Sequence, residues 1–335
     1  MSKIEWTEQT WNPTTGCDRI SPGCDNCYTL TMAKRLKGMG SAKYQTDGDP
    51  RTSGPGFGLA MHHDTLFDPL SWKKPRRIFV NSMSDLFHAK VTSEFIAQAF
   101  AIMALTPQHT YQLLTKRHAR LRSLLSDPAF QIQVLVWAHR LKDDEHEPSW
   151  DPGNRTLTNW PLPNVHLGVS VEDQKRADLR IPALLDTPAA VRFLSMEPLI
   201  GPVDLCGPIV PSRGRPRLTY WLDGRPGYSD PVPTGTGIEM CSLTTGPRLD
   251  WVIVGGESGP GARPMDPAWA AQIVQECQHS KVPVFVKQLG TIWARDTYWA
   301  GKSVAAHGDT KGGDPTHWPA ELRVREYPQT QRAAA

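Results

Sequence analysis

Three of the six cysteines lie close together near the start of the chain, at Cys17, Cys24 and Cys27, with the spacing Cys-x6-Cys-x2-Cys. Glycines and prolines in the same segment favour turns, so the loop can bring the thiols toward one point. Three thiolates leave one coordination position open on a metal. An iron–sulfur cluster, or a zinc ion with a fourth ligand, would both fit this arrangement. The spacing therefore predicts a metal centre rather than three unrelated cysteines.

The overall composition restricts the surroundings in which this chemistry would occur. The chain has 335 residues and a net charge of +3, a weak basic bias that is compatible with nucleic acid but does not indicate it. Its first residues lack the apolar run of a signal peptide, and no window approaches eighteen apolar residues. We therefore expect a cytoplasmic protein that does not enter a membrane. In that reducing compartment a cysteine cluster indicates metal or redox chemistry rather than disulfides.

The other three cysteines, Cys206, Cys241 and Cys277, are isolated in the sequence. We expect them to be ordinary packed or loop thiols. Any one of them could also supply a fourth metal ligand.

The elements that must position the cysteine loop follow an alternating pattern. A first strand is predicted within residues 4–11, and a helix over 28–37 follows the loop. Amphipathic helices are then expected over 93–105, 119–125, 174–185 and 267–279, separated by short apolar runs at 78–80, 111–115, 165–172, 191–198, 251–259 and 282–287. Buried strands that alternate with helices indicate a parallel sheet, and about seven strand candidates predict a complete or partial TIM-like (β/α) barrel.

We expect one domain over residues 1–295, interrupted by Pro/Gly-rich insertions. The insertions fall at about 38–70, 141–163 and 201–248. Residues 296–335 form a C-terminal extension, whose polar sequence predicts a tail that is packed on the surface and frays.

Polar side chains end almost every predicted strand. Because the carboxyl ends of parallel strands form the active-site rim of α/β proteins, we expect these side chains to surround the same mouth as the cysteine loop. They are Ser82 and Asp85, Lys116 and Arg117, Ser170 and Glu172, Ser195 and Glu197, Glu257 and Ser258, and Lys287 and Gln288.

A series of short motifs that cover most of residues 5 to 290 carries a family resemblance. They are Trp-Asn-Pro-Thr-Thr-Gly-Cys, Ser-Pro-Gly-Cys-Asp-Asn-Cys-Tyr, Asn-Ser-Met-Ser-Asp-Leu-Phe-His, Leu-Leu-Thr-Lys-Arg, Gly-Val-Ser-Val-Glu, Ser-Met-Glu-Pro-Leu and Val-Gly-Gly-Glu-Ser-Gly. The chain thereby resembles a phage- and prophage-associated three-Cys-motif family of unknown function. That family is radical-SAM-like and near the spore photoproduct lyases.

The resemblance implies a radical S-adenosylmethionine enzyme. In such enzymes three cysteines hold a [4Fe–4S] cluster, whose fourth iron chelates the methionine part of S-adenosylmethionine, so Cys17, Cys24 and Cys27 would be the cluster ligands. One electron, from a donor such as flavodoxin or ferredoxin, would generate a 5′-deoxyadenosyl radical, and a partner enzyme could complete the reaction. The residues then expected to bind the cofactor are Asn81, Ser82, Asp85, Ser170, Glu172, Ser195 and Glu197.

Two features depart from the radical-SAM pattern. The common spacing is Cys-x3-Cys-x2-Cys, whereas the first gap here has six residues. Gly255-Gly256-Glu257 resembles the Gly-Gly-Glu signature that meets the methionine amino group. That signature normally follows the second strand, but here it ends a late strand, so we do not transfer its role.

Basic residues near two strand boundaries predict a phosphate-bearing substrate. Lys116 and Arg117 end one strand, and Lys73, Lys74, Arg76 and Arg77 precede another. Such groups favour a nucleic acid or nucleotide whose base is modified or repaired, and a recessed site would need that base flipped out or single-stranded. The candidate substrate-binding residues are Lys116, Arg117, Glu257 and Lys287.

Two other functions stay open at this point. In the first, the zinc or iron–sulfur centre is structural and the barrel is a nucleic-acid or partner-binding module. In the second, the protein is a metal-dependent hydrolase that uses Glu172, Glu197 and Glu257 with His62 or His88. The sequence lacks the His-x-His and His-Glu-x-x-His patterns typical of such hydrolases.

Overall fold

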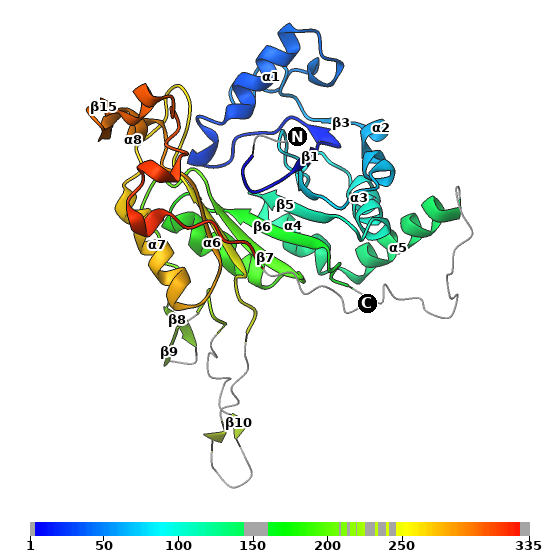
Figure 1. Ribbon diagram of the computed structural model, residues 1–335. Coiled ribbons are helices and arrows are strands. Elements are labelled where there is room, and N and C mark those ends of the chain that lie inside the picture. Colours follow the sequence, from blue (N-terminus) through cyan, green and yellow to red (C-terminus); the bar gives the residue numbers. More distant parts are fainter. Residues whose placement is uncertain are drawn as a thin grey trace. The chain divides into compact units, whose positions relative to one another are not determined.

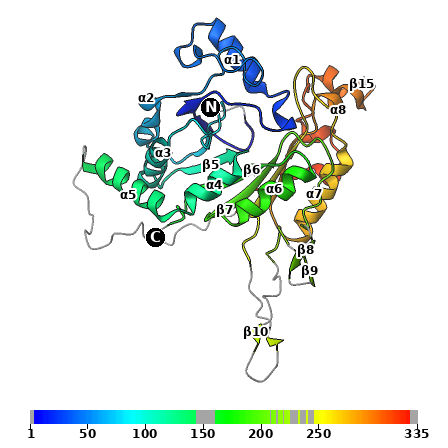
Figure 2. The same ribbon diagram turned by 180° about the vertical axis from the view of Figure 1, so that it is seen from behind.

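The protein divides by its internal contacts into two compact units. Figure 1 and Figure 2 show the ribbon with its labelled elements from two opposite sides. Unit 1 comprises Met1–Ser170 and Thr187–Val191, and unit 2 comprises Val171–Asp186 and Arg192–Ala335. The computed structural model describes residues 4–143, 160–207, 209–212, 215–218, 220–224, 232–233, 239–240 and 246–328.

The main sheet has seven strands in the order β1-β4-β5-β6-β7-β12-β13. Its pairs β1/β4, β4/β5, β5/β6, β7/β12 and β12/β13 are parallel. The order follows the chain without reversal, as in a (β/α) barrel, whereas doubly wound sheets reverse direction at a switch point. The predicted parallel α/β fold is therefore confirmed, with β1 and β13 as the two edge strands. The bounds are Gln9–Trp11, Arg77–Val80, Thr110–Thr115, Val165–Ser170, Val191–Met196, Trp251–Gly255 and Val284–Gln288.

Four of the helices in unit 1 are α1 (Tyr28–Gly38), α3 (Ser93–Leu105), α4 (His118–Leu125) and α5 (Pro128–Asp143). The sequence predicted the first three within a residue. The sequence analysis missed α5, whose last residues fall in the predicted insertion at 141–163. Most of the other residues of that insertion lie outside the described residues. Helices α3 and α5 lie side by side, with the rings of Phe100 and Phe130 5.8 Å apart (Figure 1).

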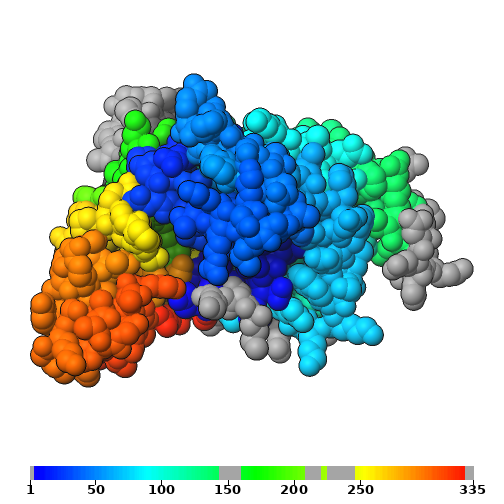
Figure 3. Space-filling model, turned by 90° about the horizontal axis from the view of Figure 1, so that it is seen from above, coloured from blue at the N-terminus to red at the C-terminus, as the bar shows by residue number. Residues whose placement is uncertain are grey.

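The predicted insertion at 38–70 folds back onto the cysteine loop. Within it, β3 (Ala60–Met61) pairs antiparallel with β2 (Thr14–Thr15), and α2 (His63–Leu66) follows directly. In the space-filling view, the blue surface near α1 lies next to the light-blue surface of the segment with β3 and α2 (Figure 3). A small core joins α1, this segment and the loop after β4, with Cys17, Leu30 and Leu36 packed against it. Its buried members are Ala33, Tyr44, Phe57 and Met83.

Unit 2 holds α6 (Gln174–Leu185), α7 (Pro267–His279) and α8 (Thr291–Asp296). The first two have the predicted bounds because an aspartate caps each. Asp173 accepts a hydrogen bond from the Arg176 N–H, and Asp266 accepts one from the Ala268 N–H. Trp251 lies fully buried in the core of this unit, with its ring 5.6 Å from Phe193.

Parts of the predicted insertion at 201–248 form two small antiparallel hairpins. The strands are β8 (Ile209–Ser212) with β9 (Arg215–Leu218), and β10 (Val232–Pro233) with β11 (Glu239–Met240). Cys241 lies outside the described residues. No helix in the part of the chain that the structure describes is both long and apolar enough to cross a membrane.

The C-terminal extension begins with a small hairpin of β14 (Tyr298–Trp299) and β15 (Lys302–Ser303) and then runs through short 3-10 helices. The expectation that this tail packs against the fold is confirmed for its described part, and the expectation that it frays is wrong there. Trp318 and Leu322 are fully buried, and the Val286 N–H donates to the Val324 carbonyl at 2.9 Å. The physical reason is that β13 is an edge strand, and the extension satisfies its outer backbone groups.

Gly16 provides a test of how the cysteine loop is held. Its φ is +86°, and a Cβ there would lie 2.1 Å from the Gly58 carbonyl oxygen. We expect Gly16→Ala to lower the free energy of unfolding by about 2 kcal/mol or more, because a left-handed φ and a backbone clash combine. Gly38→Ala is the control, since a Cβ there meets open space. Denaturant unfolding followed by fluorescence measures both, and equal midpoints for the two variants would contradict this account.

Candidate functional site

The cysteine loop of unit 1 is anchored to the segment that follows β4. The Asn12 side-chain oxygen accepts hydrogen bonds from the Ser82 hydroxyl at 3.1 Å and the Met83 N–H at 3.2 Å. Gly16 and Ser84 form a parallel bridge, and the Ser84 hydroxyl donates to the Gly16 carbonyl at 2.7 Å. These bonds place the loop at the carboxyl end of β4, as the sequence predicted.

Asn81, predicted to bind a cofactor, takes part in the same anchoring. Its φ is +60°, a conformation that asparagine adopts more readily than most residues. Its side-chain amide donates to the Thr14 hydroxyl at 2.9 Å. The Ser82 carbonyl accepts a bond from the Tyr28 hydroxyl at 2.6 Å. In the structure, both Asn81 and Ser82 therefore hold the loop in place.

Asp85 joins the ends of β4 and β5. Its buried carboxylate accepts hydrogen bonds from the Thr115 hydroxyl at 2.7 and 2.9 Å, the Phe87 N–H at 3.0 Å and the Lys116 N–H at 3.1 Å. The Arg117 Nε atom lies 4.0 Å from the same carboxylate. Asp85 thus fixes the backbone that carries Lys116 and Arg117.

Cys17 lies against these two charged groups. Burial, and next the Asp85 carboxylate, raise the pKa of the Cys17 thiol to about 12, while Arg117 and its contact with the thiol act in the opposite direction. The Arg117 Nε and Nη2 atoms are buried and make no hydrogen bond of regular geometry within the described part of the chain. A cation held in this way favours a negative charge beside Cys17.

The other two thiols contact residues of their own loop. The Cys24 sulfur lies 3.8 Å from the Ser21 hydroxyl, and the Cys27 sulfur lies 2.9 Å from the Thr29 hydroxyl. Cys27 also occupies the N-cap position of α1. Within the described residues, no three His, Cys, Asp or Glu side chains are gathered so that they would hold a metal ion. The three free thiols share one loop, but in the structure they do not meet at one point.

A pocket of about 120 Å³ opens beside Cys17 and is also lined by Asp18, Asp49, His88 and Lys90. His88 Nε2 lies 2.9 Å from the Asp18 carboxylate, which also accepts a bond from the Ser53 hydroxyl at 2.7 Å. The Ser53 bond, and then the His88 bond, lower the pKa of Asp18, whereas burial and then Arg117 lower the pKa of His88. A neutral His88 and an ionised Asp18 therefore form one wall of this pocket.

His62, the other histidine of the hydrolase hypothesis, is also engaged. Its Nε2 atom lies 2.8 Å from the Thr15 hydroxyl, next to the cysteine loop. Burial, and then Lys43, lower its pKa. Both histidines of that hypothesis thus contact the cysteine loop.

The structure brings together two predicted residues at the ends of β5 and β6. The Lys116 ammonium donates to the Ser170 hydroxyl at 2.5 Å. Gln112 and His166 lie deeper on the same two strands, where they are register neighbours. Side chains two and four residues apart share a face of a strand, so Gln112, His166, Lys116 and Ser170 form one polar surface.

Sequence reasoning missed Gln112 and His166, each only 2% exposed. Among the residues that the structure describes, the Gln112 side-chain oxygen and both His166 ring nitrogens find no hydrogen-bond partner. They lie on the opposite face from Tyr111, whose hydroxyl bonds to Thr106 just after α3. The sequence does contain a signal for both residues, because Gln112 and His166 are each the single polar residue within an apolar run, Tyr-Gln-Leu-Leu and Val-His-Leu.

In unit 2, Glu197 and Lys287 form an ion pair from two strands that are not neighbours. The Lys287 ammonium donates to the Glu197 carboxylate at 3.2 Å, from the ends of β13 and β7 with β12 between them. Gly255 leaves room for the pair, because a Cβ there would lie 2.7 Å from Glu197 Oε1. Ser195 is buried two residues before Glu197. The structure therefore brings Glu197 and Lys287 together as strand-end residues.

Glu172 and Glu257 are held in ion pairs within their own segments. Arg180 Nη1 donates to the two oxygens of the fully buried Glu172 at 3.1 and 3.0 Å. Glu257 accepts bonds from the Arg263 guanidinium at 2.7 and 3.0 Å and from the Arg263 N–H at 2.8 Å. In the structure these two carboxylates stabilise the turns that follow β6 and β12.

The first prediction from this site concerns Asp85→Asn. An amide would place N–H donors against the Thr115 hydroxyl and the Lys116 N–H, which now donate to the carboxylate. We expect the free energy of unfolding to fall by about 2–4 kcal/mol, because buried donors lose their acceptor. Glu94→Gln, an exposed change in the first turn of α3, is the control and should alter stability by less than about 0.5 kcal/mol. Similar unfolding midpoints for both variants would show that Asp85 does not join the strands.

The second prediction concerns His166 and pH. Burial lowers the pKa of His166 to about 4, from 6.5 in its ordinary state. The unfolded chain binds this proton more readily, so stability is full above pH 6.5 and falls between pH 6.5 and 4, by about 3 kcal/mol in total. His166→Leu should remove that loss, whereas the exposed His63→Leu should keep it. Unfolding free energies measured from pH 8 to pH 4 test this, and an unchanged slope in His166→Leu would contradict it.

None of the curated proteins and none of the solved structures matches the chain. The family described as "Protein of unknown function (DUF5131)" matches residues 1–319, a range that includes the cysteine loop and the strand-end residues of both units. The chain therefore belongs to this family of proteins of unknown function.

Proposed function

We propose that the protein is a radical S-adenosylmethionine enzyme that binds a [4Fe–4S] cluster through Cys17, Cys24 and Cys27. The observation that carries the proposal is the position of three free thiols on one loop, hydrogen-bonded to the segment that follows β4. In parallel α/β folds, cofactors and substrates bind at this carboxyl end of the strands. The fold that we propose for this enzyme is a partial (β/α) barrel. We also propose that the protein acts in the cytoplasm.

The donor groups of unit 1 fit such a cluster in their chemistry. Three thiolates leave one iron free to bind a chelating ligand. Arg117, with two guanidinium nitrogens buried without regular hydrogen bonds, would stabilise the negative charge that thiolate ligands bring. Cys27 occupies the N-cap position of α1, at the positive end of the helix dipole. A cluster bound here would supply the electron that cleaves S-adenosylmethionine, and flavodoxin or ferredoxin would be its donor.

The residues beside the loop would then bind and orient the ligands. Lys116 and Ser170 present an ammonium and a hydroxyl at the ends of β5 and β6, a pair suited to a carboxylate or phosphate oxygen. Asp85 positions this strand end through the Lys116 N–H. These groups support a nucleic acid or nucleotide as substrate, with a base as the group that is modified or repaired.

In unit 2, Glu197 and Lys287 are the candidate ligand contacts. Their single 3.2 Å bond joins two strand ends and is less extensive than the ion pairs of Glu172 and Glu257. Because this pair is largely buried, a ligand group that replaces one partner would have to supply a matching charge. We assign a structural role to three other predicted residues. Ser195 is buried, and Glu172 and Glu257 are already paired with arginine.

The proposal is tested by anaerobic purification with iron and sulfide analysis, followed by EPR of the reduced protein with and without S-adenosylmethionine. We expect about four irons per chain and an EPR signal that changes when S-adenosylmethionine is added. Single replacements of Cys17, Cys24 or Cys27 by alanine should abolish the cluster. Cys206→Ala, which changes an exposed thiol outside the loop, should retain it.

Two results would contradict the proposal. A colourless protein with one bound zinc would indicate a structural metal and a binding function for the fold. A cluster whose EPR signal ignores S-adenosylmethionine would retain the three cysteines as ligands but exclude the radical reaction.

A further inference from the structure

Helix α1 carries a stripe of exposed side chains on one face. Tyr28, Met32, Arg35 and the C-cap Met39 follow one another at intervals of four, three and four residues, so they lie on the same side of the helix. The exposed fractions of Tyr28, Met32 and Met39 are 54%, 40% and 69%, and Ile20 of the preceding loop is 42% exposed. We call these five residues the α1 face. Figure 3 shows the blue surface of this part of the chain turned toward the viewer.

The fold of unit 1 uses a different side of α1. Ala33 is buried in the small core described above, and Leu30 and Leu36 pack against that core. Arg35 and Lys37 lie in the last turn, where positive charge interacts favourably with the helix dipole. Neither feature accounts for exposed methionines on the other side. Neighbouring apolar side chains that stay exposed indicate an interaction surface.

Positive charge is concentrated around the α1 face. Residues 19–43 contain five lysines and arginines and one aspartate, a net charge of +4, whereas the whole chain carries +3. Arg19, Lys34 and Arg35 are exposed, and Lys37 pairs with Asp47. A partner with complementary charge is therefore acidic.

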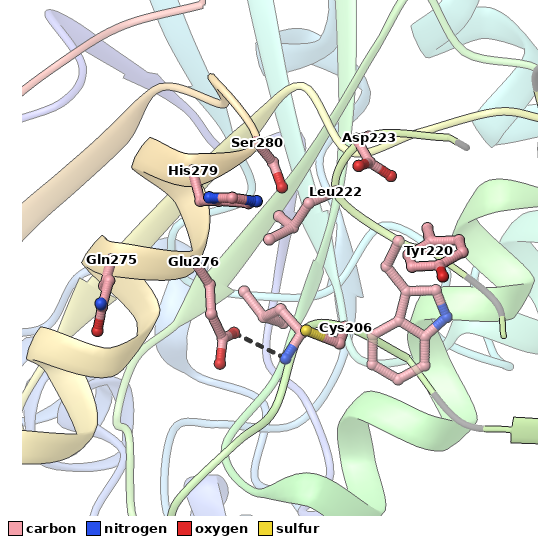
Figure 4. A pocket seen from close by; sticks show the side chains of 10 residues that line it. Cys206, Tyr220, Leu222, Asp223, Gln275, Glu276, His279 and Ser280 are labelled. Atoms are coloured by element: carbon pink, nitrogen blue, oxygen red, sulfur yellow. Dashed lines mark hydrogen bonds between the residues drawn. The ribbon is translucent and has the colours of Figure 1, made fainter.

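A pocket of unit 2 shows how the α1 face differs from a hollow within the fold. The pocket has a volume of about 320 Å³, and its apolar residues Leu205, Trp221 and Leu222 are buried (Figure 4). The Glu276 carboxylate accepts hydrogen bonds from the Leu205 N–H at 2.9 Å, the dashed line in Figure 4, and from Gln272 at 2.7 Å. These groups have partners within unit 2, whereas the apolar side chains of the α1 face are exposed to solvent.

The residue types of the α1 face favour a protein partner over a nucleic acid. Methionine, tyrosine and arginine are enriched in protein interfaces, whereas nucleic-acid interfaces are more polar and more strongly positive. A second copy of this chain fits poorly, because a symmetric contact would bring the same positive charges together. The stripe from Tyr28 to Met39 is about 16 Å long, which suits the small interface of a transient electron-transfer complex.

We propose that the α1 face is the docking surface for a small acidic protein that delivers the electron of the proposed reaction. The choice of this partner rests on the proposed function and on the position of the face, since α1 begins directly after Cys27. A protein docked here lies beside the cysteine loop. One electron leaves the reduced flavin of the docked protein and is taken up by the cluster, and no covalent bond forms or breaks.

Three probes test the docking on the full chain. Flavodoxin is an acidic electron carrier, cytochrome c is a basic one, and a single-stranded oligothymidylate represents nucleic acid. We expect isothermal titration to show binding of flavodoxin that weakens as salt is raised from about 50 to about 300 mM, and no binding of cytochrome c. No binding of flavodoxin up to about 1 mM, or equal binding of the two proteins, would overturn the proposal. Binding of the oligothymidylate without binding of flavodoxin would overturn it as well.

Two variants locate the docking surface. Met32→Glu places a negative charge within the α1 face, and Arg35→Glu reverses one of its positive charges, so each should weaken flavodoxin binding about tenfold. Glutamate favours a helix about as much as methionine and arginine do, so α1 should stay folded. The matched controls Leu179→Glu and Lys175→Glu make the same kinds of change at exposed positions of α6 and should bind flavodoxin like the original protein. Unchanged affinity in both α1 variants would show that flavodoxin docks elsewhere.

Failure of the docking surface can be told apart from failure of the proposed function. If EPR excludes the radical reaction while flavodoxin binding still depends on Met32 and Arg35, the docking surface is supported without that reaction. If instead the cluster forms, is reduced by dithionite and responds to S-adenosylmethionine, but flavodoxin does not bind, the proposed function stands and the docking surface is wrong.

Discussion

The arrangement of unit 1 depends on one buried carboxylate. Asp85 has no strong ion pair, since Arg117 Nε lies at 4.0 Å, and its charge is instead stabilised by hydrogen bonds from Thr115, Phe87 and Lys116. A buried charge is tolerated only when such donors surround it, so the carboxylate fixes the end of β5 relative to the segment after β4. The cysteine loop is bonded to that same segment. The position of Cys17 next to Arg117 therefore follows from Asp85.

Unit 2 uses carboxylates differently. Glu172 pairs with Arg180, eight residues further along the chain, and Glu257 pairs with Arg263, six residues further along. Each pair has two or more hydrogen bonds. Such pairs are costly to separate, because a buried charge would lose its partner. Glu197 and Lys287 come from two strand ends, share one bond and are partly exposed. Glu172 and Glu257 therefore stabilise turns within their own segments, whereas the pair of Glu197 and Lys287 joins the ends of two strands.

The sequence allowed the parallel sheet and the bounds of α3, α6 and α7 to be predicted, because each of these helices begins at a capping side chain. Helices α6 and α7 also have an apolar stripe, whereas α3 is apolar over most of its surface. Helix α5 was missed because apolar residues occupy both its faces. Phe130 and Val134 are buried, whereas Ile132 and Val136 are exposed. The buried C-terminal extension was missed as well, since the pairing of a polar segment with β13 is a long-range contact.

The candidate site could be predicted in its location but not in its contacts. Strand order places Asn81, Lys116 and Glu197 at carboxyl ends, and the structure places them there. Whether such a side chain anchors the fold or stays available depends on its partner. Asn81 bonds to Thr14, which is 67 residues away in the sequence, and the spacing of motifs does not reveal that bond.

The cysteine loop combines firmly held residues with loosely held ones. Asn12, Thr14, Gly16 and their partners after β4 form a continuous set of hydrogen bonds that fixes the path of the chain. Within the described residues, the thiols of Cys24 and Cys27 each form a hydrogen bond with one hydroxyl group, two or three residues away in the sequence. Sulfur is a weak hydrogen-bonding partner, so these contacts contribute little to the fold and can be replaced at low cost. A loop built in this way can move its sulfur atoms toward a metal centre while its anchors stay in place, and the free energy of metal binding would then supply the rearrangement.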